Sequence, residues 1–262
     1  MLKSLYTTAT GMKAQQTMVD MIANNIANVN TAGFKRSQAS FEDLFYVTLQ
    51  SPGLARGAGD QPVPIGTQIG SGTRLNGTTK VFTTGTLEIT ERALDVAIDG
   101  EGFFAVTLPD GSTGYTRDGG FQVDANGQLV TNAGYVVQPG ITIPANALSV
   151  TIAQDGTVQV TTPGNTAKPT TVGQLQLASF ANPAGLEPRG QNLYGETAAS
   201  GTPNAGAPNS NGLGALQQGF VEGSNVNVVE ELVSMIATQR AYELNSKAIQ
   251  TSDQMLQKLG QL

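Results

Sequence analysis

Apolar residues recur at alternating spacings of three and four at both ends of the chain, and this pattern constrains the fold more than any other feature. At the N-terminal end it predicts a helix over residues 2–29, because such spacing places one apolar seam along a helical surface. Gln16 is the one polar member of the seam, and Gly33 suits a stop shortly beyond the helix. The apolar members are Leu2, Leu5, Ala9, Met12, Val19, Ala23 and Ile26.

The C-terminal end has a matching pattern over residues 228–262, which predicts a second long helix. Asn227 and Glu230 have the spacing of a capping box, which would fix the first turn of this helix. Because each predicted helix has an apolar face that needs cover, we expect the two to pair as a coiled coil. The second seam contains Leu232, Ile236, Leu244, Ala248, Met255 and Leu259.

Between the two helical patterns the period of apolar residues changes to two. Short β-prone runs alternate with Asp-Gly and Asn-Gly dipeptides, which favour tight turns. The predicted fold class is therefore α+β, with mainly β central domains between long N- and C-terminal α-helices. The turn dipeptides begin at Asp99, Asp110, Asp118, Asn126 and Asp155.

Composition divides the chain into three predicted parts. Two stretches rich in glycine and proline flank the β-rich middle, and the prolines disfavour a long helix in residues 46–74. For residues 46–74 we expect an extended strap or a hairpin. The parts are a terminal helical domain (1–30 with 228–262), a connecting segment (31–75 with 200–227, including 46–74) and an outer β-rich domain (76–199).

A heptad seam is typical both of a helical hairpin within one chain and of a self-assembling coiled coil. Ordering a long helix costs conformational entropy that the burial of one narrow seam offsets only in part. No further helix is predicted that could complete a bundle within the chain. We therefore favour assembly with other copies of the chain.

Four asparagines lie near the end of the first predicted helix: Asn24, Asn25, Asn28 and Asn30. Asparagine is a poor helix former, so the cluster can simply end the helix. Its amides can also bridge packed helices, because each offers two donors and an acceptor. On this second interpretation the four residues set the register between helices.

Composition also excludes several classes of function. The 262 residues include no cysteine and no histidine, which removes thiolate nucleophiles, zinc–cysteine sites and the commonest general base. The chain has no phosphate loop, no cofactor fingerprint and no basic stripe that would suggest nucleic acid. No apolar run is long enough to span a membrane, and the N-terminus lacks the apolar core of a secretory signal. We expect no catalytic residue, metal, cofactor, nucleic acid or small-molecule substrate.

Four stretches carry a resemblance to a known family. They are IANNIANVNTAGFKR (22–36), GTLEITERALDVAIDGEGFFAV (85–106), YTRDGGFQVDANGQLVTNAGYVVQP (115–139) and EGSNVNVVEELVSMIATQRAYELNSKAIQTSDQMLQKL (222–259). Through them the chain resembles the rod and hook axial proteins of the bacterial flagellum along essentially its whole length. The length, and residues 46–74, resemble the distal part of the rod, with a proximal rod protein or another axial protein of the family as the alternative.

The resemblance implies a structural subunit that stacks helically into a straight, hollow drive shaft. Such a shaft transmits torque from the motor to the hook and conducts exported subunits, and it is not an enzyme. The implied partners are copies of the chain, proximal rod proteins and hook protein along the axis, ring proteins of the peptidoglycan layer and outer membrane, and the flagellar export apparatus. The implied location is the basal body, from periplasm to outer membrane, reached without a cleaved signal peptide.

Two rival classes follow from the same residues. A cell-wall hydrolase is disfavoured because the chain lacks histidine and has no carboxylate pair in a catalytic arrangement. A tail-tube or adhesin-like structural protein would share the β-rich assembly but not the paired helical ends.

Overall fold

The computed structural model describes residues 2–51, 65–163 and 169–260, without the side chains of Leu2 and Leu259. The chain divides into two compact units. The helical unit comprises residues 1–26, 37–79 and 228–262, and the β unit comprises residues 27–36 and 80–227. Of the predicted connecting segment, residues 37–75 belong to the helical unit and residues 200–227 to the β unit.

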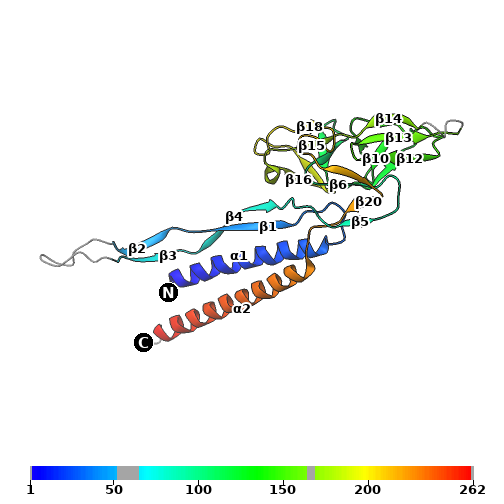
Figure 1. Ribbon diagram of the computed structural model, residues 1–262. Coiled ribbons are helices and arrows are strands. Elements are labelled where there is room, and N and C mark those ends of the chain that lie inside the picture. Colours follow the sequence, from blue (N-terminus) through cyan, green and yellow to red (C-terminus); the bar gives the residue numbers. More distant parts are fainter. Residues whose placement is uncertain (1, 52–64, 164–168, 261–262) are drawn as a thin grey trace. The chain divides into compact units, whose positions relative to one another are not determined.

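Two antiparallel helices, α1 (Leu2–Ala27) and α2 (Val228–Leu259), lie side by side in the helical unit (Figure 1). Both predicted helices are confirmed, although α1 ends two residues before the predicted limit. Asn28 begins a turn there, and Gly33 beyond it has a φ of 69°, a conformation that glycine adopts without strain. No helix within the described ranges combines the length and the apolar character needed to cross a membrane.

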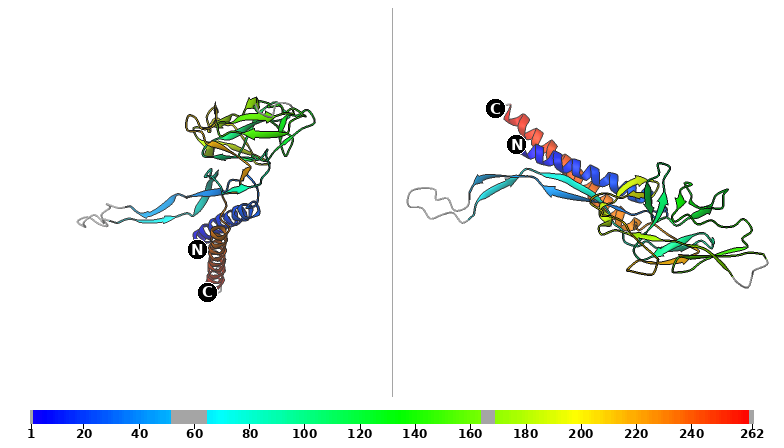
Figure 2. Two further views of the ribbon diagram at one scale, coloured as in Figure 1. Left: turned by 45° about the vertical axis from the view of Figure 1, so that its right-hand side comes forward. Right: turned by 90° about the horizontal axis from the view of Figure 1, so that it is seen from above.

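Beside the helices, the described residues of the helical unit form a two-stranded ribbon that follows α1 (Figure 2). Its first part pairs β1 (Ser37–Asp43) with β4 (Thr73–Lys80). Its second part, the arm, pairs β2 (Tyr46–Gln50) with β3 (Thr67–Gly70) in antiparallel register. The expected hairpin is confirmed for these described residues, whereas Pro52, Pro62 and Pro64 lie outside them.

The β unit is built on one large antiparallel sheet, which among the described residues contains nine strands. Seven form the path β16-β17-β8-β7-β11-β10-β9, and β15 joins β7 to β18. The strands are β7 (Phe103–Thr107), β8 (Thr113–Thr116), β9 (Phe121–Val123), β10 (Leu129–Thr131), β11 (Val136–Val137), β15 (Leu177–Ser179), β16 (Glu187–Gly190), β17 (Leu193–Gly195) and β18 (Asn204–Gly206).

Smaller sheets complete the β unit. A three-stranded sheet has the order β12-β13-β14, and two pairs, β6 with β19 and β5 with β20, bring the C-terminal part of the unit back onto its start. These elements are β5 (Leu87–Ile89), β6 (Val96–Asp99), β12 (Ser149–Ile152), β13 (Thr157–Thr161), β14 (Thr170–Gln174), the 3-10 helix η1 (Pro183–Gly185), β19 (Ala215–Gln218) and β20 (Phe220–Glu222).

Three of the five turn dipeptides form the predicted tight turns between paired strands, and two do not. Those at Asp110, Asn126 and Asp155 join paired strands, and each of their glycines has a positive φ. The Asp99 dipeptide instead lies between β6 and β7, which are paired with other strands. The Asp118 dipeptide is also not a hairpin turn, because it connects β8 and β9 across the sheet. A dipeptide predicts a change of chain direction but not which strands then pair.

The core of the β unit follows the period of two expected for strands with one buried face. Val158 and Val160 of β13 are buried while their neighbours are half-buried. An aromatic cluster packs beside the main core in edge-to-face contacts, which add to the stability that burial gives. Its rings belong to Phe82, Phe103, Tyr115, Phe180 and Tyr194.

Candidate assembly surfaces and a buried charge cluster

Helix α2 exposes many of its apolar side chains, and its most buried side chains are polar. Polar residues that are buried or half-buried recur every seven residues at Glu231, Thr238, Asn245 and Ser252, which we call the polar seam. The apolar residues Met235, Ile249 and Leu256 are half-buried on the same helix. The outer face of α2 carries exposed apolar side chains, which lack cover within the single chain. The outer face consists of Val229, Leu232, Val233, Ile236 and Leu244, which are 45% to 69% exposed.

Two contacts between α1 and α2 involve polar or small residues. The Asn25 amide donates to Glu231 Oε1 at 3.3 Å. Near the other end, a Cβ atom added to Gly11 would lie only 3.0 Å from the Asn245 side chain, so glycine permits the close approach there. These two contacts show that the helices meet along the polar seam. Coiled-coil pairing remains a prediction.

The predicted seam residues occupy different environments in the single chain. On α1, Leu5, Met12, Val19 and Ile26 are half-buried, whereas Ala9 and Ala23 are exposed. Ile22 is the most buried apolar residue of α1, and the heptad pattern did not select it. On α2 the predicted residues are exposed: Leu232, Ile236, Leu244, Ala248 and Met255. Because the predicted seams concern contacts between chains, they remain predictions.

Of the four asparagines, Asn25 is buried and holds three elements together. Its amide donates to the Ser37 carbonyl at 3.0 Å, and its carbonyl accepts from the Ser37 N–H at 2.9 Å. With the bond to Glu231, one side chain thus links α1, α2 and β1. Asn24 is exposed on α1, and Asn28 and Asn30 lie in the turn after it. A role in register between subunits remains a prediction for all four.

The predicted cap residues lie where a helix start requires them. Asn227 immediately precedes Val228, the first residue of α2, and Glu230 lies in the first turn together with Glu231. Acidic side chains there interact favourably with the positive end of the helix dipole. The capping box itself remains a prediction.

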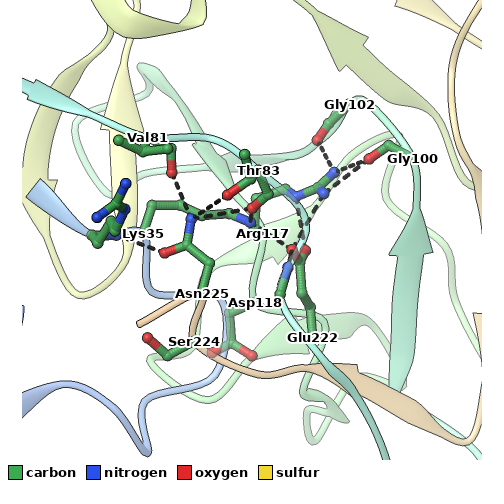
Figure 3. A network of polar contacts seen from close by, with 12 residues as sticks. Lys35, Val81, Thr83, Gly100, Gly102, Arg117, Asp118, Glu222, Ser224 and Asn225 are labelled. Carbon is green, nitrogen blue, oxygen red and sulfur yellow. Dashed lines mark hydrogen bonds and ion pairs between the residues drawn. The ribbon is translucent and has the colours of Figure 1, made fainter. Parts of the chain in front are cut away.

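A cluster of three buried charges, the charge cluster, lies in the β unit (Figure 3). Glu222, at the end of β20, is fully buried. Its Oε1 lies 2.5 Å from Lys35 Nζ and accepts from the Gly85 N–H at 2.9 Å. Its Oε2 lies 2.8 Å from Arg117 Nε. One carboxylate therefore joins segments that are far apart in sequence.

The two cations of the charge cluster also donate to backbone carbonyls. Arg117 donates to the carbonyls of Gly100 and Gly102 at 2.9 and 2.7 Å, and Lys35 donates to the Thr83 carbonyl at 2.6 Å (Figure 3). Burial lowers the pKa of Lys35, and the ion pair with Glu222 opposes that shift. A buried pair of this kind tolerates the loss of one partner poorly, because the other charge is then left in a medium of low dielectric.

Asn225 extends the charge cluster to the neighbouring backbone. Its carbonyl accepts from the Arg36 N–H at 2.8 Å, and its amide donates to the Val81 carbonyl at 2.8 Å and to Thr83 Oγ1 at 3.0 Å (Figure 3). Polar side chains therefore hold three places next to the boundaries of the β unit. Lys35 and Asn225 lie just before the chain leaves this unit at residues 36 and 227, and Thr83 lies just after the chain re-enters it at residue 80.

The described residues show no arrangement of side chains typical of a metal site. No group of three acidic side chains there is arranged to hold a metal ion. Asp124 accepts the backbone N–H groups of Asn126 and Gln128 and so holds its own hairpin turn. The features that need explanation are thus the exposed outer face of α2, the arm and the charge cluster.

Three family models match the chain, and together they define its class. The model described as flagella basal body rod protein matches residues 5–35, the flagellar hook protein FlgE/F/G D1 domain matches residues 97–160, and the flagellar basal body rod FlgEFG protein C-terminal model matches residues 217–262. The chain is therefore of the flagellar rod and hook class. Each model contains one member of the charge cluster: Lys35, Arg117 and Glu222 respectively.

Comparison with individual proteins distinguishes rod proteins from hook proteins as relatives of the chain. The chain is 55% identical to the flagellar basal-body rod protein FlgG of Buchnera aphidicola subsp. Schizaphis graminum over the full length of both. It is 49% identical to the protein of that name in Caulobacter vibrioides and 43% identical to that of Bacillus subtilis, over 100% of this chain and 99% of each relative. A flagellar hook protein FlgE from Helicobacter mustelae matches only 53% of the chain and 30% of its own length.

The chain belongs to the FlgG family of flagellar basal-body rod proteins, and it is a structural subunit of the flagellar rod. This family assembles into the axial structure of the flagellum, which places the chain in the basal body. The family is not known for enzymatic activity.

Proposed function

We propose that the chain is the subunit of the distal rod and assembles helically into a hollow drive shaft. In this proposal the shaft transmits torque from the motor to the hook and conducts exported subunits through its centre. The single observation that carries the proposal is the exposed apolar outer face of α2. Burying a Val, Leu or Ile side chain gains about 1.5–3 kcal/mol, so the face favours contact with further copies.

The arm supports the same proposal. Phe45, beside it, is 91% exposed, and the arm itself exposes Tyr46, Val47, Leu49 and Ile69. An isolated two-stranded hairpin is marginally stable at best in water. A row of exposed apolar side chains on it is typical of a surface that contacts another protein. We propose that the arm packs between neighbouring subunits and prevents the sliding that would let the shaft bend.

The charge cluster gives the shaft subunit a means to carry load. The chain crosses between the units at four places, and Glu222 and Asn225 hold the β-unit side of three of them, next to residues 36, 80 and 227, through ion pairs and hydrogen bonds. A force on any of these three crossings is then resisted by directional contacts rather than by apolar packing alone. In the proposed shaft, torque therefore passes through these crossings.

The proposed partners follow from the proposed position. Proximal rod proteins and hook protein would adjoin the polymer along its axis, and ring proteins of the peptidoglycan layer and outer membrane would surround it. The shaft would run from the periplasm to the outer membrane, and its subunits would pass the flagellar export apparatus without a cleaved signal peptide.

Charge reversal of an apolar contact tests the assembly proposal. Leu244→Asp changes an exposed residue of α2, so the monomer should remain folded, but the polymer would have to bury a carboxylate in every subunit. We expect electron micrographs to show no rods. The control, Gln250→Asp, adds the same charge at an exposed polar position of α2 and should leave rods intact. Normal rods with Leu244→Asp would contradict the proposal.

A further inference from the structure

A groove lies between α1 and the two-stranded ribbon of the helical unit. Its volume is 480 Å³, enough for several aliphatic side chains. One wall is a single face of α1 and the other is formed by β4 and Leu44. The groove is lined by Tyr6, Thr10, Lys13, Ala14, Thr17, Leu44, Thr73, Arg74 and Leu75.

The lining combines apolar surface with positive charge. Tyr6 and Leu75 are 58% and 41% exposed, so apolar side chains of the groove still contact solvent. Lys13 and Arg74 contribute two cations, and among the described residues no acidic side chain lines the groove. Arg74 is ion-paired with Glu42 outside the lining, so Lys13 carries most of the positive charge that an occupant would meet. An occupant that fits would present small or branched apolar side chains with a carboxylate beside them.

The first turns of α2 present such a surface. Val229, Leu232, Val233 and Ile236, which we call the ridge, follow the spacing of one helical face and are all exposed. Glu230 is exposed beside the ridge, and residues 228–239 contain no lysine or arginine. The ridge therefore matches the groove in polarity and complements it in charge.

A ridge cannot reach the groove of its own chain. The contacts of Asn25 with Glu231 and of Gly11 with Asn245 fix the antiparallel register of the two helices. In this register the ridge lies level with the last two turns of α1, whereas the groove lies level with the middle of α2. At 1.5 Å per residue the two are roughly 15–20 Å apart along the helices.

We infer that the ridge of one subunit docks in the groove of the next copy of the chain. The inference rests on the proposed self-assembly and names the surfaces that meet. Because ridge and groove are different surfaces, the contact is heterologous, and repetition of such a contact builds an open helical filament rather than a closed dimer. Lys13 and Arg74 would then lie near Glu230 of the neighbouring copy.

The absence of cysteine from the sequence permits a clean cross-linking test. The double variant Ala14→Cys with Val233→Cys places one thiol in the groove and one on the ridge. Within one chain, residue 14 is level with residue 242, nine positions from Val233, so an internal disulfide exceeds the usual Cα separation of about 4.4–6.8 Å. We expect oxidised rods to give a ladder of cross-linked chains in denaturing gels.

Controls separate this inference from the proposed assembly. Each single-cysteine variant, the soluble monomer of the double variant, and a pair that combines Ala14→Cys with Gln254→Cys should all give uncross-linked chains. Rods of the ridge–groove variant without a ladder would overturn the inference and leave self-assembly intact. Failure of the unaltered chain to form polymer would overturn the proposed function and the inference with it.

Exchanging the charges of Lys13 and Glu230 tests the ridge–groove contact in a second way. Lys13→Glu and Glu230→Lys each place like charges at the proposed contact, and each should reduce the yield of rods. The combined variant restores opposite charges and should recover that yield. A combined variant no better than either single change would overturn the ridge–groove pairing.

Discussion

The two units of the chain differ in which side chains they bury. In the β unit Phe104, Phe121 and Leu177 are completely buried, and even the charged Glu222 is enclosed with its partners. In the helical unit the buried positions of α2 are polar, such as Thr238, while Leu244 is 67% exposed. The β unit buries many of its apolar side chains within the chain, and the helical unit leaves many of its apolar side chains exposed.

This difference indicates whether the free energy of apolar burial is gained when the chain folds or when copies of the chain associate. Burial of apolar area is the dominant favourable term in folding and in most association. The β unit gains that term when the chain folds, whereas in the proposed shaft the helical unit gains a large part of it when copies meet. Substitutions in the two units should therefore change different measurements: the free energy of unfolding in one, and polymer formation in the other.

The largest expected effect comes from the charge cluster. Glu222→Ala leaves Lys35 and Arg117 buried without their carboxylate, which should lower the free energy of unfolding of the β unit by about 3–5 kcal/mol. Chemical denaturation of the full-length monomer measures this. The matched control Glu187→Ala removes an exposed carboxylate of the same unit and should change the free energy of unfolding by less than about 0.5 kcal/mol. Equal effects of the two variants would show that the charge cluster does not support the fold.

A pair of leucines compares the two units with the same chemical change. Leu177→Ala creates a cavity in the core of the β unit and should cost about 2–5 kcal/mol in the unfolding of the monomer. Leu244→Ala should leave monomer unfolding nearly unchanged but weaken polymerisation, seen as a higher concentration of chain needed to form rods. If Leu244→Ala destabilised the monomer as much as Leu177→Ala does, the contrast between the units would be wrong.

The smallest expected effect on folding comes from removal of the arm. Deletion of residues 50–70 should leave the unfolding of the β unit unchanged, because the arm belongs to the helical unit. The polymer should become curved or flexible in electron micrographs, because the contact that blocks sliding between subunits is lost. A straight polymer with the stiffness of the full-length chain, prepared in parallel, would count against a stiffening role.

Local patterns were sufficient to predict the elements that depend on local sequence. The heptad spacing predicted α1 and α2, and the Asp-Gly and Asn-Gly dipeptides predicted the turns at Asp110, Asn126 and Asp155. Each signal lies within the segment that it describes. An extended strap or a hairpin was expected for residues 46–74, since proline disfavours a helix there, and the pairing of β2 with β3 matches the hairpin.

The sequence did not indicate which surfaces would meet. The polar seam was missed because apolar spacing was used to predict the contact between helices, whereas the single chain pairs Asn25 with Glu231 instead. The charge cluster was missed because Lys35, Arg117 and Glu222 come from three segments far apart in the chain. A charged side chain in sequence also looks the same whether it ends in solvent or beside a buried partner.

Hydrogen exchange of the monomer and of the polymer tests the central claim most directly, because it reports protection of each segment separately. We predict weak protection of residues 2–27 and 228–259 in the monomer and strong protection of both in the polymer. The core strands of the β unit, such as β7 and β15, should be protected in both states. Strong protection of the two helices in the monomer would contradict the claim that the helical unit is completed by its neighbours.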